Sequence, residues 1–186
     1  MADSKTLLQK YVSDLLALES HIYQAIDKQV KGNADDPEVN SKYAAYATTI
    51  KSHRDALASR LAALGGAANS PVKEGVAVVF GVAAGIIDKF RSEEVSKNFR
   101  DDFTALSLSL LSYQMLHTTA LALGDRETAE LAAGNAKDNA KFVREIERFM
   151  PGIVVRDLKK NHDEVAAALN ENAAMETGDL ITEIWK

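Results

Sequence analysis

The positions of proline and glycine constrain the fold of this chain more than any other feature of its sequence. Three prolines and ten glycines occur among 186 residues, and nearly all of them lie between long segments with a regular apolar pattern. Because both residues interrupt regular structure, this placement indicates a few elements of unusual length. Elements of that length are helices, and the sequence predicts no β-strand.

Four long helices are predicted from apolar residues that recur at spacings of three, four and seven, which mark one face of a helix. Asp3 or Ser4 is a suitable N-cap for the first helix, and Asp36 followed by Pro37 is a typical start for the second. Pro151 is predicted to close the fourth. The predicted ranges are 3–31, 37–64, a third that begins between 92 and 98 and ends at 123, and 127–150. A shorter, apolar helix is predicted at 72–90.

Four long helices joined by turns predict an all-α, up-and-down four-helix bundle, with the short helix carried between the second and third. An apolar content of 46% is enough for a core in a chain of this length. We therefore predict a bundle at 1–154 and a helical C-terminal tail at 155–186.

Composition excludes several classes of function. A net charge of −5 gives no basic surface for nucleic acid, and the absence of cysteine excludes disulfides and thiolate chemistry. The polar amino terminus does not resemble a signal peptide, and the longest apolar run, 76–87, is too short to span a membrane. A cytoplasmic protein without a membrane span is predicted.

Polar residues inside the predicted apolar faces are candidates for chemistry. Glu19 falls within the apolar face of the first helix, and His53 within that of the second. A buried carboxylate is costly unless it is paired, protonated or bound to a metal. We therefore consider a residual metal site at Glu19, His53, Asp138 and His117, which would hold a single iron, manganese or zinc ion. The alternative is a hydrogen-bonded polar pair without a cofactor.

Three stretches resemble the YciE/YciF-type ferritin-like family over about residues 5–150. The chain reads Leu-Glu-Ser-His at 18–21, Asp-Pro-Glu at 36–38 and Leu-Gly at 64–65, and His53 stands twelve residues before Gly65 as in that family. The resemblance implies a ferritin-like fold and a di-iron site. The family's acids on the third helix are replaced here by Ser and Leu at 106–112, so Glu19 and His53 are the ligands that carry over, with Asp138 as a possible replacement.

The depleted site predicts a non-enzymatic ferritin-like protein, and the resemblance implies a stress-associated or assembly role. We expect a homodimer or larger oligomer that forms through the helix faces or through the tail. The alternative is a metal-binding protein or weak oxidase that uses the residual site. A third hypothesis assigns the C-terminal tail, which ends in Leu180, Ile181, Ile184 and Trp185, to docking on a protein partner or a neighbouring subunit.

Overall fold

The computed structural model describes residues 2–66 and 95–186, and regular structure in these two ranges is entirely helical. The helices are α1 (Ala2–Gly32), α2 (Pro37–Ala63), α4 (Val95–Ala122), α5 (Arg126–Asn161), α6 (Asp163–Ala166) and α7 (Ala173–Ile184). The prediction of an all-α bundle of four long helices with a helical tail is confirmed. The helix predicted at 72–90 lies outside the described residues.

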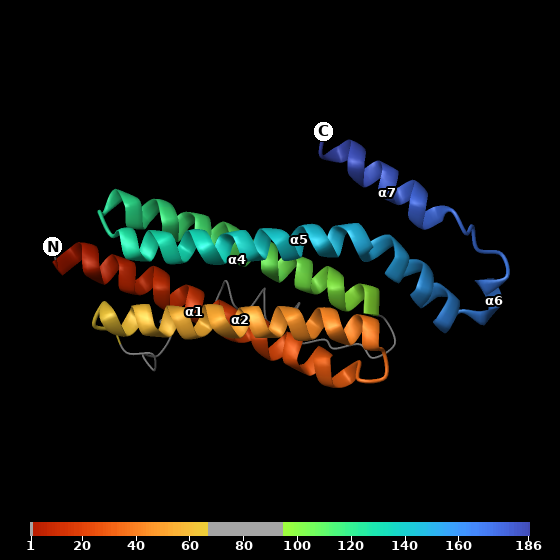
Figure 1. Cartoon of the computed structure of the whole chain (residues 1–186), viewed down its shortest axis with the longest axis horizontal. Helices are drawn as coiled ribbons and strands as arrows, with labels where there is room; N and C mark the ends of the chain where they lie inside the picture. Colours follow the sequence, from red (N-terminus) through yellow and green to blue (C-terminus); the bar gives the residue numbers. More distant parts are fainter. Residues whose placement is uncertain (1, 67–94) are drawn as a thin grey trace.

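The four long helices form two antiparallel hairpins, α1–α2 and α4–α5, which pack against each other (Figure 1). In both hairpins, the second helix begins with an aspartate that caps its N-terminus. The Asp36 carboxylate accepts a hydrogen bond from the backbone N–H of Val39, and Asp125 does the same for Thr128. Gly124 precedes Asp125 with φ +75°, a conformation that favours glycine. Short turns of this kind place consecutive helices side by side.

The predicted end of the fourth helix at Met150 is wrong. α5 continues through Pro151 to Asn161, although proline lacks an N–H and costs about 3 kcal/mol inside a helix. Burial beyond the proline offsets this cost. Ile153 lies in the core, and the buried Asp157 accepts a hydrogen bond of 2.7 Å from the backbone N–H of Ser96, near the start of α4. The end of α5 also bends away from its first half (Figure 1).

The predicted division at residue 154 falls inside α5, and two separate domains stay a prediction. Among the described residues, none of the helices combines the length and the apolar character needed to cross a lipid bilayer.

Aromatic rings pack against one another in the core between the hairpins. Tyr43 stacks on Phe99 with ring centroids 4.4 Å apart, and Phe99 meets Phe149 edge-on at 4.7 Å. Tyr46 packs against Phe142 at 4.4 Å. These pairs join α2 to both helices of the second hairpin, so the core is shared by the two hairpins.

Arg60 joins the hairpins at one end of the bundle. One amino group of its guanidinium donates to both carboxylate oxygens of Asp125 at 2.7 and 2.6 Å, and its Nε donates to the Thr128 hydroxyl at 2.7 Å. The Arg60 side chain is only 10% exposed, so water screens these contacts little. The guanidinium also holds the N-cap residue of α5 in place.

We predict that Asp125→Ala lowers the free energy of unfolding by about 2–3 kcal/mol, because it removes a helix cap and leaves Arg60 partly unpaired. Urea unfolding followed by circular dichroism measures the change. The matched control is Asp55→Ala, which removes an exposed ion pair with Lys51 on α2 and is expected to leave the midpoint unchanged. Equal midpoints for the two variants would show that Arg60 does not join the hairpins.

Candidate functional site

Each long helix contributes one buried polar side chain to the centre of the bundle. The four residues are Glu19 on α1, His53 on α2, Ser109 on α4 and Asn139 on α5, and none is more than 3% exposed. We call this set the central polar layer. It brings together the two residues that sequence reasoning placed on inward faces, and it adds two that the sequence did not reveal.

The Glu19 carboxylate is the centre of this layer. Its Oε1 accepts hydrogen bonds from the Ser109 hydroxyl and from the Asn139 side-chain amide, the latter at 3.4 Å. The same amide donates to Ser109 Oγ at 2.9 Å, so three residues on three helices form a closed group. These bonds offset part of the cost of burying the carboxylate.

His53 lies between two carboxylates, one buried and one at the surface. Its Nδ1 is 3.7 Å from Glu19 Oε2, and its Nε2 is 3.2 Å from Asp138 Oδ2. The distance between His53 Nδ1 and Glu19 Oε2 exceeds hydrogen-bond length. Among the described residues, neither of these atoms has a hydrogen-bond partner. The Asp138 side chain is 54% exposed. His53 therefore links the interior carboxylate to one in contact with solvent.

Two opposing effects act on the pKa of His53. Burial is the largest single effect and lowers it, because it disfavours the charged imidazole. The contacts and negative charges of Glu19 and Asp138 together outweigh burial, so the pKa is raised above its ordinary value. The imidazolium form gives the Glu19 charge a positive partner inside the bundle.

Tyr113 of α4 borders the central polar layer. Its ring meets the His53 ring edge-on with centroids 5.9 Å apart, and its hydroxyl accepts a hydrogen bond of 3.0 Å from Asn135. Burial and, after it, the charge of Glu19 raise the pKa of Tyr113 well above the usual value. The phenol therefore stays protonated near neutral pH.

The central layer does not fit a di-iron centre. Bundle proteins that hold two iron ions supply one Glu from each of two helices and a Glu-x-x-His pair from each of the other two. The buried side chains that repeat this spacing here are Glu19, Ser109, the pair Ile50 and His53, and the pair Asn139 and Phe142. Only one of the six is a carboxylate and only one an imidazole. This donor set cannot balance the charge of two iron ions.

His117 is not part of the layer. It is half-buried on α4, eight residues beyond Ser109, which corresponds to about 12 Å along the helix. Among the described residues, no group of three or more His, Cys, Asp or Glu side chains has the arrangement of a metal site. Glu19, His53 and Asp138 do lie together, and a metal ion on them stays a prediction.

A second buried polar group lies between α1 and α4, and sequence reasoning missed it. Asp102 is 2% exposed and accepts a hydrogen bond of 3.0 Å from the Gln29 side chain. Burial is the largest effect and raises the pKa of Asp102, the Gln29 bond lowers it by less, and the neighbouring Asp101 charge adds to the rise, so that the pKa is about 8. Asp102 is therefore largely protonated at neutral pH.

The fold and the central layer define an all-α helical bundle with a polar centre. The sequence family described as "Domain of unknown function (DUF892)" matches residues 3–159, and the chain belongs to this family. The chain is also similar to a protein of known crystal structure from Xanthomonas campestris pv. campestris, with a TM-score of 0.69 and 17% identity over 84% of this chain and 97% of that one. This likeness shows the shared fold. No curated protein matches the chain.

We predict that His53 makes the stability of the bundle depend on pH. Because its pKa is raised on folding, its stabilisation is complete below the unfolded value of about 6.5 and is lost as pH rises through the folded value. Urea unfolding across pH 5.5–9 measures the free energy of unfolding, and we expect that His53→Gln does not show this loss of stability. His21→Gln, at an exposed position on α1, is the control. A wild-type profile in His53→Gln would contradict the predicted coupling.

We predict that Asp102 also makes the stability of the bundle depend on pH, over a range that begins at lower pH and is wider than that of His53. The unfolded carboxyl releases its proton near pH 3.8 and the folded one near 8, so stability falls between these values by up to about 1.4 kcal/mol per pH unit. Asp102→Asn resembles the protonated carboxyl and is expected to reduce this slope and to be the more stable protein at pH 8. Parallel profiles for variant and wild type would contradict the raised pKa.

Proposed function

We propose that this protein is a ferritin-like bundle of the YciE/YciF type that has lost di-iron chemistry and acts without catalysis, in a stress-associated or assembly role in the cytoplasm. The observation that carries the proposal is the composition of the central layer. If Glu19 and His53 are taken as two of the six ligands of a di-iron bundle, the other four positions with that spacing hold Ile50, Ser109, Asn139 and Phe142. The layer is suited to holding helices together.

The helix faces then become the better candidates for function, and we propose that they mediate self-association. Several apolar side chains on α1 and α4 are exposed although they belong to a packed bundle. Leu111 is 56% exposed, Met115 is 50% exposed and Leu7 is 42% exposed. Apolar surface of this kind supports a homodimer or larger homo-oligomer, or docking of another protein.

One observation favours an alternative function, the binding of a single metal ion. Glu19 Oε2 and His53 Nδ1 are 3.7 Å apart, and among the described residues both lack hydrogen-bond partners, as does Asn139 Oδ1. This separation is slightly longer than the roughly 3–3.6 Å between two ligand atoms that share one zinc-sized ion, so a small side-chain movement would bring both atoms to such an ion. Asp138, on the outer side of His53, would hold the imidazole in the orientation that leaves Nδ1 free for the ion.

Elemental analysis after reconstitution separates the two functions. Purified protein is exposed to Fe²⁺, Mn²⁺ or Zn²⁺ and then desalted. The proposal predicts less than about a tenth of an equivalent of each metal, because a layer with one carboxylate and one imidazole offers too few ligands for tight binding. About one equivalent in the wild type that disappears in Glu19→Ala/His53→Ala would contradict the proposal and support the metal-binding function.

A gain-of-function variant provides the control for this experiment. Ile50→Glu, Ser109→Glu, Asn139→Glu and Phe142→His together restore the ligand types at the four altered positions. If the folded variant takes up about two equivalents of iron under the same conditions, the bundle is able to hold the metal and the residue changes explain its loss. Iron binding by the wild type at the same level would contradict that explanation.

A further inference from the structure

α7 lies along α5 without burying any of its own residues. The helix carries the sequence AAMETGDLITEI, and each of its side chains is at least partly exposed. Its end is fixed by Trp185, whose indole N–H donates a hydrogen bond of 2.8 Å to Glu147 on α5. Figure 1 shows α7 returning beside α5 after the turn that contains α6. An amphipathic helix is therefore held near the bundle but not packed into it.

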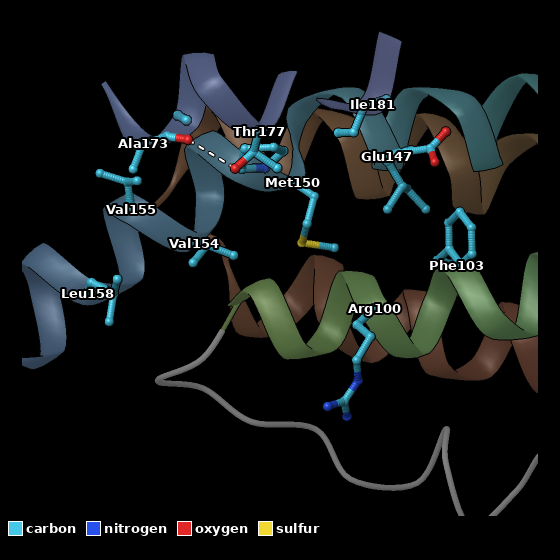
Figure 2. Close-up of a pocket in the computed structure, with 13 residues that line it drawn as sticks. Arg100, Phe103, Glu147, Met150, Val154, Val155, Leu158, Ala173, Thr177 and Ile181 are labelled. Atoms are coloured by element: carbon cyan, nitrogen blue, oxygen red, sulfur yellow. Dashed lines mark hydrogen bonds between the residues drawn. The ribbon is translucent and has the colours of Figure 1, made fainter. Parts of the chain in front are cut away.

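A cavity of about 440 Å³ lies between these helices. Its wall is formed by α5, by the face of α7 that carries Ala174 and Ile181, and by Phe103 of α4 (Figure 2). The α5 side is aliphatic, with Met150, Val154 and Leu158 among its residues. Ligand-binding pockets in proteins typically measure roughly 300–1,000 Å³ and have mainly apolar walls. This partly open cavity has a volume in that range and a mainly apolar wall.

The polar side chains in the wall already have partners. The Thr177 hydroxyl donates to the Ala173 carbonyl at 3.0 Å, and Glu147 accepts from Trp185. Arg100 pairs with Asp101 at 2.6 Å, and Figure 2 shows its side chain directed away from α5 and α7. A charged or strongly polar ligand would lose hydration and meet mainly aliphatic side chains here. The wall therefore selects for an uncharged ligand.

The arrangement also favours a small molecule over a protein segment. Three helices of the same chain form the wall, and α7 runs along one side of the cavity. A helix of a partner protein, roughly 10 Å wide with its side chains, does not fit a volume of about 440 Å³ unless α7 moves and the bond between Trp185 and Glu147 breaks. A small molecule would leave both in place. Met150 adds adaptability, because its unbranched thioether fits ligands of different shapes.

We propose that the cavity between α5 and α7 binds an uncharged, largely hydrocarbon small molecule. Burial of the ligand also covers the apolar face of α7, so binding is driven by removal of apolar surface from water on both sides. This proposal goes beyond the proposed function and does not involve the central polar layer. The two can therefore fail independently.

The test is a fluorescence titration of the full chain with N-phenyl-1-naphthylamine, an uncharged probe that emits strongly in apolar surroundings. We expect saturable binding at one site per chain, with displacement by 1-decanol. Ala174→Phe places a ring in the cavity and is expected to weaken binding at least tenfold. Met175→Phe adds the same ring at the neighbouring position, which does not line the cavity and is 63% exposed, and is expected to bind like the wild type.

Both variants change exposed or half-exposed positions on α7, so the bundle is expected to keep its unfolding midpoint, which circular dichroism verifies. Equal binding by Ala174→Phe and wild type would overturn the proposal, as would non-saturable uptake of the probe or failure of 1-decanol to displace it. A doubling of the mass in solution when the probe binds would also overturn it, because the probe would then occupy a surface between two copies.

Discussion

The buried carboxylate of Glu19 is the constraint on which the rest of the structure depends. A charge at 0% exposure is tolerated only where hydrogen bonds and an opposite charge surround it. Ser109, Asn139 and His53 meet this need from three other helices. A shift of any helix by one turn would remove its partner from Glu19 at a cost of several kcal/mol, so the layer fixes the alignment of all four helices.

The two hairpins are held together by contacts of different kinds along the bundle. Arg60 joins them at one end, the aromatic pairs of Tyr43 and Tyr46 pack in the core, and on α2 the central layer residue His53 lies between these contacts in sequence. Proton binding also contributes to the stability of the bundle. The raised pKa values of His53 and Asp102 mean that folding favours proton uptake at both, so both make the bundle less stable as pH rises.

The sequence predicted the helices well because caps such as Asp36 and glycines such as Gly124 act locally. The residues of the site were harder to predict. Glu19 and His53 stood out as polar residues in apolar faces, whereas Asn139 was passed over for Asp138 because a carboxylate is the better ligand. Adjacent helical residues differ by about 100° in direction, so an error of one residue in the predicted inward face exchanges them. The continuation of α5 through Pro151 depends on tertiary burial that local rules do not contain.

The central claim is that Glu19 and His53 stabilise each other directly, without a metal ion. A double-mutant cycle with Glu19→Gln and His53→Gln tests it most directly, with unfolding free energies measured at pH 6 in the presence of a chelator. We predict a coupling free energy of at least ~1 kcal/mol, as for residues in one polar network. A coupling near zero under these conditions, restored by adding a divalent metal, would contradict the claim and identify the layer as a metal site.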